Sequence, residues 1–184
     1  MKVLVGVSGG IAAYKTCEII RRLRDDGHEI QVVMTEAATQ FVTALTFETL
    51  SGRPVASSLW SGGDPSIEHI RLARWPDVIA VVPATAHTIG RIANGLADDL
   101  LSTLVMASRA DVPVVLAPAM NTAMWENPIV RGNLARLREV DGGQRYRVVQ
   151  PAEKTLACGE TGMGALAEEG RILAAIVEAA ARSR

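Results

Sequence analysis

The sequence predicts an α/β fold in which a doubly wound, Rossmann-like parallel sheet forms the middle of three α/β/α layers. Strand-like apolar runs recur at about residues 2–7, 30–35, 77–83, 112–117 and 145–149, and segments with helical periodicity lie between them. This alternation is typical of parallel sheets with crossover helices. Alanine and glycine are plentiful whereas aromatic residues make up only 4% of the chain, which suits helices packed closely on a sheet.

The first strand is expected to end in a tight glycine turn. Its apolar run stops at the stretch SGGI, residues 8–11, and apolar side chains then follow at helical spacing through Leu23. This first helix should end at Gly27, because glycine readily adopts the left-handed conformation that follows many helices. A strand–turn–helix unit therefore opens the chain.

Further helices are expected at about residues 36–50, 97–108, 128–140 and 168–182. A long connection containing SGRPV and WSGGDPS precedes the third strand, and a connection of this length is often functional. No repeat, low-complexity tract or linker composition divides the sequence. Residues 1–184 are therefore expected to form a single domain.

Composition excludes several classes of function. The net charge of −1, from 19 basic and 20 acidic side chains, offers no general attraction for nucleic acid or for an anionic membrane surface. No apolar run approaches the ~20 residues that span a bilayer, and the chain starts with a strand pattern, so a cytoplasmic location is expected. Cys17 and Cys158 form neither a disulfide framework nor a metal-ligand pattern, so no metal is expected.

The glycine turn favours an anion at the start of the first helix. Backbone N–H groups there lack partners, and the helix dipole adds a partial positive charge. The triphosphate-binding motif fails, because Tyr14 occupies its glycine position before Lys15 and Thr16. Lys15 is then expected to point out of the helix. The dinucleotide motif G-x-G-x-x-G is absent too, which leaves the phosphate of a mononucleotide.

Ligands of open α/β sheets bind beyond the carboxyl ends of the strands. The segments that follow the first four strands read SGGI, TEAATQF, PATAHT and PAMNTAMW. They are rich in glycine and small polar residues, and none is a run of charges. This composition suits a neutral planar ring that carries one phosphate.

Five segments together, SGGIAAYK, IEHIRLARWPD, PATA, PAMNTAMW and LACGETGMG, resemble the flavin-containing cysteine decarboxylases. The resemblance is strongest to the phosphopantothenoylcysteine decarboxylase branch of coenzyme A biosynthesis, and it covers essentially the whole chain. PAMNTAMW and the histidine segment are its specific motifs. The family's cofactor is FMN, a mononucleotide, so the resemblance agrees with the spacing of the glycine turn.

The resemblance also implies a set of site residues. The implied catalytic residues are His69, Asn121 and Cys158, the last as a proton donor. FMN would be bound at its phosphate by Ser8, Gly9, Gly10 and Ile11, and along its ribityl chain and ring by Thr35, Phe41, Thr85 and Ser102. The substrate would be bound by Asn121, Met120 and Ala119.

The implied reaction converts 4′-phospho-N-pantothenoylcysteine to 4′-phosphopantetheine through a thioaldehyde. Direct loss of CO2 would leave an unstabilised carbanion, whereas hydride transfer to oxidised FMN from the carbon beside sulfur creates an electron sink. Reduced flavin then returns the hydride while Cys158 supplies a proton. His69 could act on the thiol or on the carboxylate, and Asn121 could orient the carboxylate without adding a charge.

Structural roles are alternatives for several of these residues. His69 alone could be a structural hydrogen-bonding residue, and Cys158 a simple loop residue. Cys17 is expected to pack as a small apolar side chain, His28 to lie on the surface and His87 to begin a helix. The residues that could serve either in packing or beside a ligand are Met120, Met124 and Trp125, and those expected on a solvated helix face are Arg131, Arg136 and Arg138.

Other functions remain open as alternatives. The same flavin chemistry would decarboxylate the C-terminal cysteine of a peptide. A non-catalytic FMN-binding regulatory subunit is a third hypothesis, and a flavin prenyltransferase fits PAMNTAMW less well.

Ala165 stands where related loops commonly carry arginine. The resemblance further implies a homo-oligomer, a trimer or a dodecamer, and either a free-standing decarboxylase or one half of a polypeptide that also carries a ligase.

Overall fold

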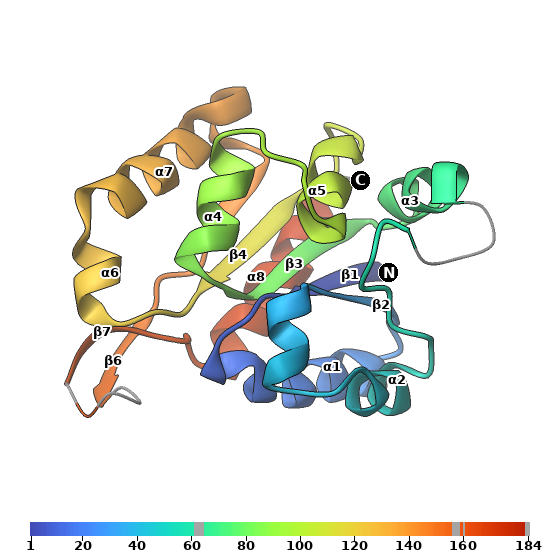
Figure 1. The fold of residues 1–184 in the computed structure, drawn as a ribbon, viewed down its shortest axis with the longest axis horizontal. Helices are drawn as coiled ribbons and strands as arrows, with labels where there is room; N and C mark the ends of the chain where they lie inside the picture. Colours follow the sequence, from blue (N-terminus) through green and yellow to red (C-terminus); the bar gives the residue numbers. More distant parts are fainter. Residues whose placement is uncertain (61–64, 156–158, 160, 183–184) are drawn as a thin grey trace.

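The computed structural model describes all residues except 61–64, 156–158, 160 and 183–184 (Figure 1). Five parallel strands form its main sheet in the order β2-β1-β3-β4-β5. In chain order they are β1 (Lys2–Val7), β2 (Glu29–Met34), β3 (Val78–Ala84), β4 (Val114–Pro118) and β5 (Tyr146–Val148). The chain therefore extends from β1 toward both edges of the sheet, and the predicted doubly wound α/β fold is confirmed.

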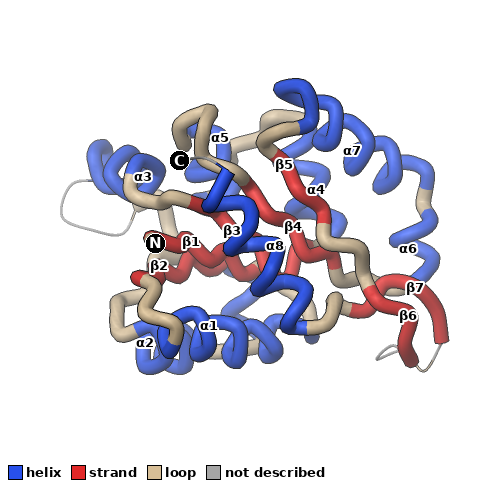
Figure 2. Tube along the Cα trace, turned by 180° about the vertical axis from the view of Figure 1, so that it is seen from behind, coloured by secondary structure: helices blue, strands red, loops and turns tan. Residues whose placement is uncertain are grey.

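Helices cover both faces of this sheet (Figures 1 and 2). One face packs against α1 (Thr16–Asp25), α2 (Ala44–Ser51) and α8 (Glu169–Arg182). The other packs against α3 (Pro65–Arg74), α4 (Ala86–Ala93), α5 (Leu100–Ala107) and α7 (Pro128–Glu139). Shorter helical segments are η1 (Ile11–Lys15), η2 (Glu36–Gln40), α6 (Thr122–Glu126) and η3 (Val140–Gly143).

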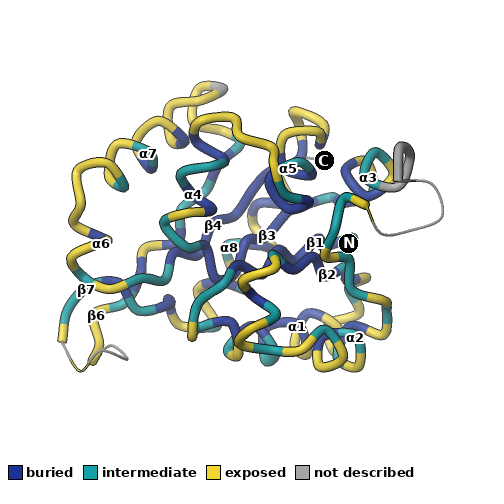
Figure 3. The backbone as a smooth tube through the Cα atoms, viewed as in Figure 1, coloured by how far each residue is buried: buried dark blue, intermediate teal, exposed yellow. Residues whose placement is uncertain are grey.

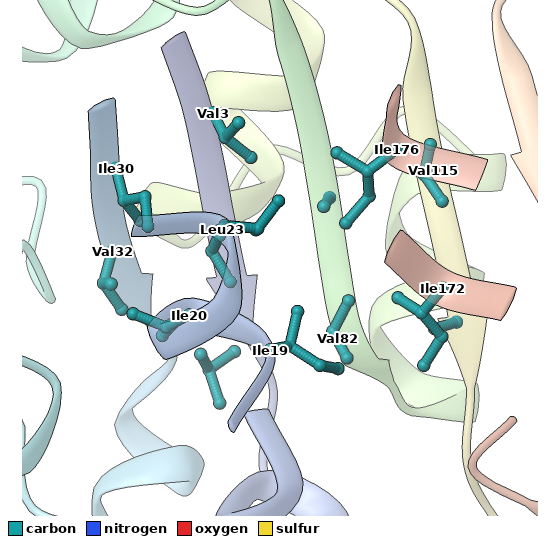
Figure 4. Packing of buried hydrophobic residues seen from close by; sticks show 14 of the residues in the cluster. Val3, Ile19, Ile20, Leu23, Ile30, Val32, Val82, Val115, Ile172 and Ile176 are labelled. Carbon is teal, nitrogen blue, oxygen red and sulfur yellow. The ribbon is translucent and has the colours of Figure 1, made fainter. Parts of the chain in front are cut away.

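Alternate side chains of each strand serve the two halves of the core. Val3 and Val5 belong to the cluster with α1 and α8, whereas Leu4 belongs to the cluster with α4 and α5. Figure 4 shows Ile19, Ile20 and Leu23 of α1 directed at the strands, with Ile172 and Ile176 of α8 beside them. Both faces of the central strands are buried, as Figure 3 shows, which explains their continuous apolar sequence.

The predicted strands agree with the observed ones to within two residues at each end. Helix α1 ends at Asp25, and Gly27 follows with a φ of 79°, as expected of a left-handed cap. The helix predicted at 36–50 is instead divided into η2 and α2. Its division has a local cause, because Thr43 adopts an extended conformation, with a ψ of 151°, as the N-cap of α2.

The glycine-rich segment near the C-terminus contains a second, two-stranded sheet. It pairs β6 (Ala152–Thr155) with β7 (Thr161–Ala165) in antiparallel fashion. This hairpin lies beside α6, at the end of the main sheet where β4 finishes (Figure 1). Within the described residues, no helix is long and apolar enough to cross a membrane.

Candidate functional site

A cleft of about 980 Å³ opens at the carboxyl ends of β1, β2, β3 and β4. Its wall contains residues 9–12 after β1, 35–37 after β2, 85–88 after β3 and 119–121 after β4. All four segments predicted to follow strands therefore meet at one site. A volume near 1,000 Å³ is at the upper end of the range of small-molecule and cofactor sites.

Ser8 ties the ends of two neighbouring strands together. Its Oγ donates to the carbonyl oxygen of Pro83 at 2.7 Å and accepts from the backbone N–H of Thr85 at 3.0 Å. Ser8 is buried and does not line the cleft. It therefore holds the glycine turn against the start of α4, and its predicted contact with phosphate stays a prediction.

The two glycines of the turn have different roles. A Cβ at Gly9 would collide with the backbone and side chain of Ala37, so the chain itself requires glycine there. Gly10 is extended, with a φ of −167°, and a Cβ there would lie 3.6 Å from the Cγ2 atom of Thr85, an ordinary contact. Since Gly10 lines the cleft, its missing side chain leaves space for a ligand that the fold does not otherwise need.

Helix starts surround the same part of the cleft. Thr35 caps η2 by accepting from the N–H of Ala38 at 3.3 Å, and Thr85 caps α4 by accepting from the N–H of Thr88 at 3.3 Å. No side chain caps η1, whose N-cap is Gly10. Uncapped backbone N–H groups at such a start are suited to the oxygens of a phosphate.

The end of β4 and α6 form the opposite wall. Ala119, Met120, Asn121 and Met124 line it, whereas Trp125 is buried in the core. The Oδ1 atom of Asn121 accepts from the N–H of Met124 at 2.8 Å and caps α6. Because the oxygen is used in this way, the amide NH2 of an exposed cleft residue is left to donate to a ligand.

The β6–β7 hairpin closes one side of the cleft. The N–H of Met120 donates to the carbonyl oxygen of Gly164 at 2.9 Å, and a Cβ at Gly164, whose φ is 137°, would collide with the Met120 carbonyl. Lys154 of β6 lines the cleft and forms an ion pair with Glu168, which precedes α8. Lys154, with a smaller contribution from Lys15, lowers the pKa of the Glu168 carboxyl.

The cleft also contains charged side chains, which the composition of the segments after the strands did not predict. Arg91 of α4 contacts Asp98 at 3.0 Å and also pairs with Asp99. Lys15 of η1 also lines the cleft.

Ser102 does not line the cleft; it is buried and donates to Asp99 Oδ1 at 2.7 Å within the capping box of α5. Within the described residues no cluster of His, Cys, Asp and Glu could hold a metal ion.

Two further expected site residues among the described ones, His69 and Phe41, do not line this cleft. His69 is half-buried on α3, which lies at the opposite end of the molecule from α6 and the β6–β7 hairpin (Figure 1). Phe41 follows η2 and is 48% exposed. Cys158 lies outside the described residues. The catalytic and cofactor roles of these three residues stay predictions.

The remaining histidines and Cys17 have clear positions. His87 starts α4, as predicted, and lines the cleft. His28 is half-buried; burial, and secondarily the N-terminal charge, lowers its pKa against an opposing effect of Asp26. Cys17 is half-buried against the core, as expected, and burial raises the pKa of its thiol.

Comparison with known proteins identifies the family. The Flavoprotein family model matches residues 1–181. A probable phosphopantothenoylcysteine decarboxylase of Streptococcus mutans is 42% identical over 96% of this chain and 97% of its own length. The bifunctional coenzyme A biosynthesis protein CoaBC of Vibrio vulnificus is 45% identical over 94% of this chain, which spans only 42% of that longer protein.

A solved structure agrees with these sequence similarities. A PPC decarboxylase variant complexed with pantothenoylaminoethenethiol superimposes with a TM-score of 0.81 at 34% identity, and the match covers 96% of each chain. The similarity therefore includes the main sheet and the segments that surround the cleft. The chain belongs to the Flavoprotein family.

Proposed function

We propose that the cleft holds FMN, with the phosphate at the glycine turn and the ring toward Asn121. The uncapped start of η1, the open space beside Gly10 and the cleft volume support this placement. Thr85 lies between these ends, at the start of α4 after β3, whereas Thr35 lies at the start of η2, on the other side of the glycine turn. When bound, the flavin supplies the electron sink that loss of CO2 from a cysteinyl carboxylate requires.

The proposed reaction is the decarboxylation of 4′-phospho-N-pantothenoylcysteine to 4′-phosphopantetheine in coenzyme A biosynthesis. The orientation of the Asn121 amide is the observation that supports this reaction most directly. Its oxygen is fixed by the Met124 N–H, so its NH2 group is presented to the cleft. Such a group orients a substrate carboxylate without the strong ground-state attraction of a positive charge. Near full-length similarity to the Streptococcus mutans protein supports this substrate.

A complete active site would then need a second copy of the chain. His69, proposed as the catalytic histidine, lies on α3, away from the cleft of its own chain (Figure 1). We propose a homo-oligomer, trimeric or dodecameric, in which α3 of one copy meets the cleft of another. Imidazole there would exchange a proton with the substrate thiol or carboxylate near neutral pH.

Decarboxylation of a peptide with a C-terminal cysteine is the second candidate. Ala165 lines the cleft on β7, so this hairpin position contributes no charge toward a phosphorylated substrate tail. Both candidates share the cysteine carboxylate, Asn121 and the flavin. They differ in what occupies the cleft beyond the cysteine.

The test is a comparison of the two substrates. Protein loaded with FMN is given equal concentrations of 4′-phospho-N-pantothenoylcysteine and of a short peptide ending in cysteine, and CO2 release is measured for each. Faster release from the phosphorylated substrate is expected. Release from the peptide alone would replace the proposed function with the second candidate, and binding of FMN without release from either would favour a regulatory subunit.

A further inference from the structure

The geometry points to His87 as a cofactor-side residue that stabilises the reduced form of the flavin ring more strongly than the oxidised form. This inference rests on the proposed function, because it requires FMN in the cleft. His87 lines the cleft from the first turn of α4 and is exposed to it. Of the two histidines other than His69, His28 lies outside this cleft at the far end of α1.

The order of the strands places the start of α4, and His87 with it, between the proposed phosphate position and Asn121. The phosphate site follows β1 and the substrate-orienting Asn121 follows β4, and β3 lies between these two strands in the sheet. A molecule that extends from the glycine turn to Asn121 must cross the end of β3, where α4 begins. There Thr85 approaches Gly10, and His87 follows two residues later.

The start of α4 favours negative charge in front of it. The helix is eight residues long, and Thr85 caps the N–H of Thr88. N–H groups of the first turn have no partners within a helix, and the helix dipole places partial positive charge at this end. The imidazole of His87 adds a hydrogen-bond donor at the same position, with a full positive charge when protonated.

Four of the other charged groups that line the cleft within the described residues are in ion pairs. The full set is Lys15, Glu36, Arg91, Asp98, Asp99 and Lys154. Arg91 pairs with both aspartates and Lys154 pairs with Glu168. From α7, which packs on α4, Arg136 donates to the carbonyl of Ala93 at the opposite end of the helix. His87 therefore adds a hydrogen-bond donor to a cleft in which Arg91 and Lys154 are already in ion pairs.

A donor at this position changes the relative stability of the reduced and oxidised flavin. Uptake of two electrons and one proton by oxidised flavin leaves one net negative charge on the ring system, which a nearby donor or cation stabilises. Because the oxidised ring is neutral, His87 strengthens binding of the reduced form selectively.

The experiment measures the midpoint potential of bound FMN against a reference dye, with dithionite as the reductant, at pH 6 and pH 8. It uses the wild type, His87→Asn, His87→Gln and the matched control His28→Asn. At pH 6 we expect His87→Asn to lower the ratio of reduced to oxidised affinity about tenfold, which is about 30 mV for a two-electron couple. The His28→Asn control should match the wild type at both pH values.

Equal potentials for the wild type and both His87 variants at pH 6, with FMN bound, would overturn the inference while leaving the proposed function intact. A second comparison excludes a role at the phosphate. If His87→Asn weakened oxidised FMN but not riboflavin, His87 would serve the phosphate and the inference would be wrong. A wild type that binds no FMN would instead overturn the proposed function itself, and this inference with it.

Discussion

The Oδ1 atom of Asn121 accepts a hydrogen bond of 2.8 Å from the backbone N–H of Met124. This contact joins a structural role to a chemical one. It caps α6, and it fixes the orientation of the amide so that NH2 is left for the cleft. The two roles can be separated by substitution, because aspartate caps helices as well as asparagine but offers no donor.

Asn121→Asp is expected to preserve the fold and to abolish efficient decarboxylation. The carboxylate keeps the cap but replaces the NH2 donor with a charge that repels the substrate carboxylate. The expected fall in kcat/KM is about 100-fold or more, as for loss of one well-placed donor. Thermal unfolding should stay close to that of the wild type, whereas Asn121→Ala should lose about 1 kcal/mol of stability with the cap. An Asp variant with wild-type kcat/KM would contradict the assigned role.

The two glycines of the turn should respond differently to alanine. Gly10→Ala is expected to unfold at the wild-type temperature but to bind FMN at least tenfold more weakly, because the added methyl group occupies the space left for the ligand. Gly9→Ala is expected to lose about 1–3 kcal/mol of stability through its collision with Ala37. Flavin fluorescence quenching and thermal unfolding measure the two effects. Wild-type FMN affinity in Gly10→Ala would remove the phosphate from this turn.

The fold was predictable because its strands and helices leave regular patterns of apolar residues in the sequence. Continuous apolar strands and intervening helical periodicity indicated the parallel sheet, and Gly27 marked the end of α1. The break at Thr43 was missed, because the apolar residues on its two sides continue one helical pattern. The β6–β7 hairpin was missed as well, since β6 is mostly exposed and polar, β7 contains two glycines, and neither strand has an alternating apolar pattern.

The Lys154–Glu168 ion pair should hold the β6–β7 hairpin in place in a pH-dependent manner. Lys154 lowers the pKa of Glu168 below its ordinary value of 4.5, so the pair is intact above that pH and is lost as the pH falls through the lowered value. At pH 7, Lys154→Met is expected to reduce the hydrogen-exchange protection of the Met120 N–H, which bonds to Gly164.

The control for this prediction is Glu153→Gln, an exposed change on the same strand. Its protection at pH 7 should equal that of the wild type. As the pH falls through the lowered pKa of Glu168, the wild type should approach Lys154→Met. If protection in the wild type and Lys154→Met were the same at pH 7, the ion pair would have no part in holding the hairpin.

Less of the site than of the fold could be predicted. The glycine turn and PAMN segment were found because backbone geometry and the carboxyl-edge rule act through short, local sequences. The charged set around Arg91 was missed, because Asp98 and Asp99 meet that arginine only when α4 and α5 pack together. Ser8 and Ser102 were expected beside the cofactor, yet each supports another cleft residue through hydrogen bonds.

Mixing two inactive variants tests whether His69 acts on the cleft of another copy. His69→Asn and Asn121→Asp homo-oligomers are each expected to be inactive. Refolding them together should restore part of the activity. In some of the mixed oligomers, a cleft that keeps Asn121 meets an α3 from another copy that keeps His69. If every active site used His69 and Asn121 of the same chain, the mixture would stay inactive. Size-exclusion chromatography of the mixture confirms that oligomers have formed.

The central claim is that this cleft catalyses a redox-neutral loss of CO2. It is tested most directly with protein loaded with FMN, under argon, with carboxyl-labelled 4′-phospho-N-pantothenoylcysteine in large excess over enzyme. The account predicts equal amounts of labelled CO2 and 4′-phosphopantetheine over many turnovers without an added oxidant. Bound FMN with no labelled CO2, or release that stops after one equivalent per active site, would contradict it.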